Sequence, residues 1–355
     1  MKPRRVLLWS VYLAATALAF EAMARLALTN ASFRERVFTN DDAAWRLQWV
    51  ARHSREGSLN YVLDDWNASR GWTLKANLRD VPFRGKSVSS NSRGARGVQE
   101  LSLVKPPGVT RIVVLGDSFT FGEEVGDDET YSHVLQQLIP HSEVVNLGVH
   151  GYGHDQMLHY LREEGVKYKP DIVILGFLPD DAERNVLSFR DYAKPHYALK
   201  GGRLSLTTRP IPRPEDMLAS EKWRSKFGDL LTMLRSRYEW RSGKTQAITR
   251  DLTWALLDEI KATSEAAGAR VAYAYLPVYG EISRTDEGMT GRERAFFAYC
   301  NERRIQSLYL QPFFRQQARK GVSFKTQGHW DALEHRIAAE GMRSILAEKG
   351  WIAAQ

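Results

Sequence analysis

The stretch Arg111-Ile-Val-Val-Leu-Gly-Asp-Ser-Phe-Thr-Phe-Gly122 decides the fold of this chain. Residues 112–115 form an apolar run of the length of a short buried strand, and Gly116 breaks the pattern just before Ser118. A serine at the carboxyl end of a parallel strand lies where open α/β sheets bind ligands. A helix beginning there would direct free backbone N–H groups at an anion. The stretch therefore predicts either a serine nucleophile beside N–H donors or a serine that only caps a helix.

Strand-like and helix-like segments alternate through the rest of the chain. The apolar runs predict strands over residues 112–115, 144–147, 171–177, 271–276 and 306–310. The amphipathic runs predict helices over residues 131–138, 155–168, 248–266, 291–304 and 332–349. Such alternation is typical of βαβ units around a parallel sheet with right-handed crossovers.

Gly116-Asp117-Ser118 resembles the first sequence block of the SGNH (GDSL-type) hydrolases. Three later segments follow in the order of that family: Asn146-Leu-Gly-Val-His-Gly151, Gly176-Phe-Leu-Pro-Asp180-Asp181 and Gly328-His329-Trp330. The resemblance covers roughly residues 109–355. It implies an α/β fold of the flavodoxin-like three-layer α/β/α type, with a central parallel sheet and no cofactor.

In that family a serine is the nucleophile, a late histidine is its base, and a glycine and an asparagine complete the oxyanion hole. The resemblance implies that Ser118 and His329, with Asp117 beside the serine, form the catalytic group. It also implies an oxyanion hole made by Ser118, Gly151 and the side chain of Asp180. The family has asparagine at this last position, and an aspartate donates a hydrogen bond only when it is protonated.

A second departure concerns the acid that orients the histidine. Gln327 stands where the family usually has this acid, and its amide cannot supply the negative charge that stabilises an imidazolium. Asp331, the nearest acid in sequence, is the alternative orienting residue. His329, Asp331 and His335 also have a spacing that could suggest a metal. We predict no metal there, because the last helix would carry Asp331 and His335 away from His329.

The N-terminus has the pattern of an export signal. Lys2, Arg4 and Arg5 precede an uncharged run over residues 6–20, and Glu21 and Arg25 then fall one helical turn apart. Ala22-Met23-Ala24 has the small residues of a cleavage site. The segment is either a retained signal-anchor or a cleaved signal, and the anchor is the favoured reading. Both place the body of the chain outside the cytoplasm. We expect a single-pass protein of a bacterial inner membrane with a periplasmic catalytic domain, or a cleaved secreted form.

These features divide the chain into three parts. Residues 1–28 form the anchor helix, residues 29–108 a membrane-proximal accessory region, and residues 109–355 the hydrolase-like domain, with Pro106-Pro107-Gly108 at the boundary. A basic, proline-containing insertion at about 186–246 is expected over the active-site edge. It either binds an anionic glycan or is a solvated basic face.

Composition limits the function further. The net charge is +8, and we find no nucleic-acid-binding motif, so an anionic membrane or an acidic polysaccharide is the better partner for this charge. Cys300 is the one cysteine, which excludes an intramolecular disulfide. Three functions remain: an esterase that removes acyl groups, such as O-acetyl, from an exported glycan; a polysaccharide O-acyltransferase; and a non-catalytic glycan-binding or assembly protein.

Overall fold

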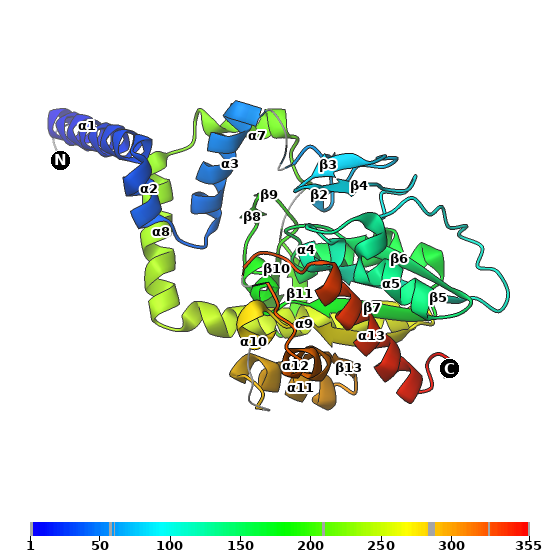
Figure 1. Cartoon of the computed structure of the whole chain (residues 1–355). Helices are drawn as coiled ribbons and strands as arrows, with labels where there is room; N and C mark the ends of the chain where they lie inside the picture. The colour runs from blue at the N-terminus through cyan, green and yellow to red at the C-terminus, as the bar shows by residue number, and fades with distance from the viewer. Residues whose placement is uncertain are drawn as a thin grey trace.

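The computed structural model describes residues 3–56, 59, 61–207, 210–282, 288–325 and 327–353. Lys2, part of the predicted basic start, lies outside the described residues. A five-stranded parallel sheet forms the centre, in the spatial order β13-β12-β7-β5-β6 (Figure 1). Its strands are β5 (Thr110–Gly116), β6 (Ser142–Gly148), β7 (Ile172–Phe177), β12 (Arg270–Tyr275) and β13 (Gln306–Tyr309). Counted along the chain this order is 2-1-3-4-5, the flavodoxin-like order.

Helices cover both faces of the sheet, because successive side chains of each buried strand point to opposite sides. Val113 and Leu115 of β5 pack into one apolar cluster, and Ile112 and Val114 pack into the other. The first face is covered by α6 (His154–Glu163), α9 (Lys244–Ala266) and α11 (Gly291–Glu302). The second face is covered by α5 (Tyr131–Leu138), α12 (Gln311–Arg319) and α13 (Ala332–Glu348). The predicted three-layer α/β/α architecture is confirmed.

The element boundaries agree with the sequence predictions in most places. Three differ. The helix predicted over 155–168 ends at Glu163 and is followed by a 3₁₀ turn over Gly165–Tyr168. Helix α12 was not predicted, although its glutamine and arginine residues favour a helix and its apolar residues lie on one face. In the accessory region, the sequence from residue 37 to 55 has helical spacing, but the chain is not helical between Val37 and Asp42. Asp41 accepts hydrogen bonds from the N–H groups of Ala43 and Ala44, so that a new helix begins at Asp42.

The accessory region shares a core with the sheet domain. It contains α2 (Ala31–Val37), α3 (Asp42–Glu56) and two hairpins, β1 (Asp64–Asn67) with β2 (Gly71–Leu74) and β3 (Val81–Phe83) with β4 (Lys86–Val88). Trp49 and Trp72 are fully buried in the cluster that also holds Val113 and Leu115. The indole Nε1 of Trp72 donates to the carbonyl oxygen of His150 at 3.0 Å. This region therefore packs directly on the sheet domain.

The insertion leads from the sheet domain to the N-terminal helices. Its elements are β8 (Phe189–Arg190), β9 (Tyr192–Ala193), β10 (Tyr197–Lys200), β11 (Arg203–Leu206), α7 (Pro214–Glu221) and α8 (Lys226–Arg241). Helix α8 contacts α2, α3 and α1 (Pro3–Thr29) (Figure 1). Residues 4–29 of α1 are long and apolar enough to cross a membrane, as an anchor or a signal sequence would.

Candidate active site

Ser118 lies at the point where the strand order of the sheet reverses. The chain passes from β5 outward to β6 and then returns to β7 on the other side of β5. In open α/β sheets the ligand crevice lies at such a point, beyond the carboxyl ends of the strands. The short helix α4 (Ser118–Phe121) begins directly after β5, and Asp117 caps it by accepting a hydrogen bond from the N–H of Phe119 at 3.0 Å. A Cβ at Gly116 would collide with Thr120, so glycine is needed for this tight strand-to-helix turn.

His329 meets Ser118 across 211 positions of sequence. Its Nε2 lies 2.8 Å from the Ser118 Oγ, within hydrogen-bond distance. The imidazole lies against the ring of Phe119, and the next residue, Trp330, is buried and donates its Nε1–H to the carbonyl oxygen of Pro277. The aromatic contacts on either side thus hold the histidine loop over the end of β5. The structure brings these two sequence-predicted residues together.

Two glutamates lie on the other side of the imidazole. The Nδ1 of His329 is 3.5 Å from Glu123 Oε2 and 3.5 Å from Glu124 Oε1. These distances are long for hydrogen bonds, but such contacts commonly tighten when substrate binds. Partial burial would raise the pKa of Glu124, but Lys325 and His329 hold it below its usual range. This pair was not predicted from the sequence, although two consecutive glutamates just after Gly122 are a visible signal.

The sequence suggested Gln327 and Asp331 as residues that could orient the histidine. Gln327 is exposed. Asp331 caps α13, where its Oδ1 accepts from the N–H groups of Leu333 at 2.9 Å and Glu334 at 3.2 Å. The carboxylate of Asp331, an alternative orienting residue, is thus engaged at the helix N-terminus. Among the described residues, no group of three metal-ligating side chains occurs.

Gly151, which follows β6, has the backbone geometry and the crowding that require glycine. Its φ is +75°, and a Cβ there would lie 2.9 Å from Asp191 Oδ2 and 3.0 Å from Arg190 Nη1. Asp180, in the 3₁₀ turn Pro179–Arg184, has a side chain that is 61% exposed and pairs with Arg292 at 3.0 Å. This outward placement does not favour the predicted part of Asp180 in an oxyanion hole.

The neighbouring carboxylate, Asp181, is fully buried and forms an ion pair with Arg184. Burial raises the pKa of Asp181 well above its usual value, which the charge of Arg184 opposes. Arg184 also lies 3.2 Å from Asp117 Oδ2 and donates to the carbonyl oxygen of Tyr152 at 2.8 Å. One guanidinium therefore joins the three segments that follow β5, β6 and β7. Asp117, predicted as part of the catalytic group, is in contact with this arginine and with the Ser118 Oγ at 3.2 Å.

Other polar residues near these segments are used inside the fold. Asn185 accepts from the N–H of His154 and donates to Thr253 Oγ1 at 2.8 Å. Burial lowers the pKa of His154 to about 3, so this histidine is neutral.

The accessory region also reaches the site. Arg84, in the β3–β4 turn, lies 3.0 Å from the Glu123 Oε2 that faces His329.

No protein-family model matches the chain, and neither does any curated protein sequence. Solved structures do match it. A member of the lipolytic G-D-S-L family from Veillonella parvula is 12% identical, with 67% of this chain and 99% of that chain covered at a TM-score of 0.40. A putative G-D-S-L lipolytic protein from Desulfitobacterium hafniense is 15% identical, with coverages of 67% and 99% and a TM-score of 0.39. A catalytic mutant of an acetylxylan esterase from Geobacillus stearothermophilus is 16% identical, with coverages of 71% and 100% and a TM-score of 0.40.

Proposed function

We propose that this chain is an exported, membrane-anchored serine esterase of the SGNH type that removes acyl groups, such as O-acetyl, from a glycan. The observation that carries the proposal is the 2.8 Å contact between Ser118 Oγ and His329 Nε2 at the switch point of the sheet. An unassisted serine is a weak nucleophile, and an imidazole within hydrogen-bond distance is the usual means of activating it.

In the first half of the reaction, Ser118 Oγ attacks the acyl carbonyl carbon while His329 Nε2 takes the hydroxyl proton. The carbonyl oxygen becomes an oxyanion. When it collapses, the bond to the sugar oxygen breaks, and His329 returns its proton to that oxygen as the alcohol leaves. The negative charge of Glu123 and Glu124 beside Nδ1 stabilises the imidazolium between these two steps.

In the second half, water replaces the sugar. His329 Nε2 takes a proton from water, whose oxygen attacks the acyl carbon. When the intermediate collapses, the bond between the acyl carbon and Ser118 Oγ breaks, His329 returns its proton to Oγ, and the free carboxylic acid leaves. In both halves the oxyanion would be held by the backbone N–H groups of Ser118, at the start of α4, and Gly151. One such donor contributes about 3–4 kcal/mol to transition-state stabilisation.

A second candidate function is a non-catalytic glycan-binding or assembly protein with the same fold. The placement of two side chains near the end of β7 favours it. Asp180 is turned outward to Arg292, and Asn185 is committed to His154 and Thr253, so neither is free to supply the third oxyanion donor. The glycan substrate in both candidates rests on the expected export of the chain and on its net positive charge.

Covalent labelling with a fluorophosphonate tests the catalytic candidate. The full chain in detergent should be labelled, and Ser118→Ala should lose both the label and the hydrolysis of short acyl esters, by roughly 10³-fold or more. Ser132→Ala is the matched control, because Ser132 is also buried but lies on α5. If wild type is well folded and takes no label, the non-catalytic function is correct. If Ser118→Ala keeps the turnover, Ser118 is not the nucleophile.

The proposed location is the periplasmic face of an inner membrane, with α1 as a retained span. Arg4 and Arg5 would stay on the cytoplasmic side. An alkaline phosphatase fused to the C-terminus of the chain should therefore be active in cells. An inactive phosphatase, paired with an active cytoplasmic reporter at the same point, would contradict this topology.

A further inference from the structure

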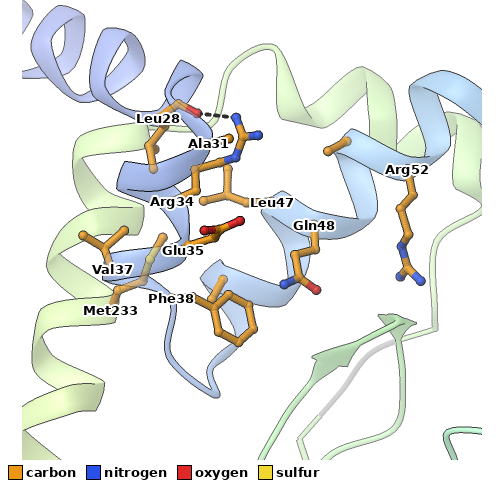
Figure 2. A pocket seen from close by; sticks show the side chains of 12 residues that line it. Leu28, Ala31, Arg34, Glu35, Val37, Phe38, Leu47, Gln48, Arg52 and Met233 are labelled. Atoms are coloured by element: carbon orange, nitrogen blue, oxygen red, sulfur yellow. Dashed lines mark hydrogen bonds between the residues drawn. The ribbon is translucent and has the colours of Figure 1, made fainter.

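Helix α8 has apolar side chains on two opposite faces. Met233 is buried and lines a pocket of about 450 Å³ between α1, α2, α3 and α8, together with Leu28, Phe38 and Leu47 (Figure 2). On the other side, Leu231, Leu234 and Tyr238 follow one stripe at helical spacing and are 51%, 59% and 73% exposed. A surface helix that faces water normally has polar residues on its outer side. We therefore expect this apolar stripe to contact another apolar surface.

The stripe is continuous with the apolar surface of α1. The first turn of α8 contacts α1 near its carboxyl end: Phe227 stacks on Phe20, with ring centroids 5.2 Å apart. Phe20, Met23 and Leu26 of α1 are themselves exposed. Figure 1 shows α8 leading away sideways from the carboxyl-terminal end of α1 rather than running alongside it. If α1 spans a bilayer, α8 therefore lies along the bilayer surface.

The polar contacts of α1 indicate at which residue of this helix the bilayer surface lies. Glu21 is the first acidic residue after the uncharged run 6–20, and its carboxylate accepts from the N–H groups of Lys226 and Phe227 at 3.0 Å each. Ser225 Oγ also donates to it, at 2.8 Å. The N–H groups of Lys226 and Phe227 are free backbone donors at the start of α8, and such groups favour a negative charge nearby. Glu21 thus ends the uncharged run of α1 at the level where α8 begins.

The residues that flank the stripe are those found at membrane interfaces. Arg235 and Arg241 lie on either side of it along α8 and are exposed, and Trp223 just before α8 is 90% exposed. Arginine side chains bind anionic headgroups, and tryptophan and tyrosine concentrate at the headgroup level. An apolar stripe between basic residues is the pattern of a helix that lies in the interface.

We propose that α8 is an interfacial helix, with Leu231, Leu234 and Tyr238 inserted into the headgroup–acyl boundary of an anionic phospholipid bilayer on the same side as the sheet domain. The anchor and α8 together then fix the sheet domain in one orientation to the membrane. The proposal rests on α1 being a retained span, as argued above, and does not depend on esterase activity.

Spin-label accessibility of the full chain tests it, in vesicles of phosphatidylethanolamine and phosphatidylglycerol. In a Cys300→Ala background, single nitroxides are attached at Leu234→Cys, at Tyr238→Cys as a second variant, and at two reference positions. Leu13→Cys, 64% exposed in α1, reports on the span itself, and Arg250→Cys, on the exposed surface of α9, reports on water. Labels at 234 and 238 should collide severalfold more with oxygen, and severalfold less with a water-soluble nickel chelate, than the label at 250.

Three other outcomes overturn the proposal in distinguishable ways. If Leu13 is lipid-exposed but 234 and 238 match position 250, α1 spans the bilayer and α8 lies in water. If 234 and 238 are shielded from both reagents, protein covers the stripe, as in an association of two copies. If position 13 itself is accessible to the nickel chelate, the retained span fails, and the interfacial helix fails with it.

Discussion

The ends of β5 and β7 lie side by side in the central sheet, yet their polar side chains are used in opposite ways. After β5, Ser118 begins a helix and has its hydroxyl beside a histidine from a distant loop. After β7, Asp180 faces solvent, and Asp181 is consumed by an internal ion pair with Arg184. The comparison teaches that a position at the reactive edge is available for chemistry only if the local fold does not already use its side chain.

Among variants that keep Ser118 and His329, the largest effect should come from the two acids behind His329, because they complete the β5 side of the comparison. Replacing both, Glu123→Gln with Glu124→Gln, should lower kcat/KM on an acyl ester by about 10²–10⁴-fold, since an amide cannot stabilise the imidazolium by charge. Each single change should cost less, because either remaining carboxylate still lies 3.5 Å from Nδ1.

Two further variants control this prediction. Asp331→Asn keeps a good helix cap and should leave the rate almost unchanged. Gln327→Asp should not raise the rate, because two carboxylates already serve the imidazole. A large gain from Gln327→Asp, or full activity in the double glutamine variant, would show that the Glu123–Glu124 pair is not the acid.

At the end of β7 we expect a loss of stability rather than of catalytic rate, because Arg184 supports the structure there. Arg184→Gln leaves the buried carboxylates of Asp117 and Asp181 without their cation. Breaking a buried ion pair from one side costs about 3–5 kcal/mol, so the denaturation midpoint in detergent should fall clearly. Adding Asp181→Asn to this variant removes one stranded charge and should restore part of the loss. An Arg184→Gln variant of wild-type stability would mean that this ion-pair network does not hold the three segments together.

The sequence predicted the sheet well because its signals are local. Strands such as β5 and β7 are short runs buried on both faces, and helix α13 has a clear apolar face and a capping aspartate. The approach of Ser118 and His329 could be predicted from motif order. The acid could not, because Glu123 and Glu124 follow the serine rather than precede the histidine, and only the fold brings them to it. The direction of Asp180 depends on the 3₁₀ turn that Pro179 begins, which sequence spacing does not define.

The smallest effect is expected for Asp180→Asn, which introduces at the end of β7 the residue that SGNH hydrolases have there. The carboxylate is exposed and pairs with Arg292 at the surface, and such pairs contribute little, so kcat/KM should change by less than about threefold. Arg292→Gln is the matched control and should have the same small effect. A tenfold or larger gain in Asp180→Asn would mean that this side chain swings inward during turnover and repels the oxyanion when ionised. A tenfold or larger loss would mean that it donates to the oxyanion as a protonated acid. Either result would erase the difference between the two strand ends, because both would then supply side chains to the reaction.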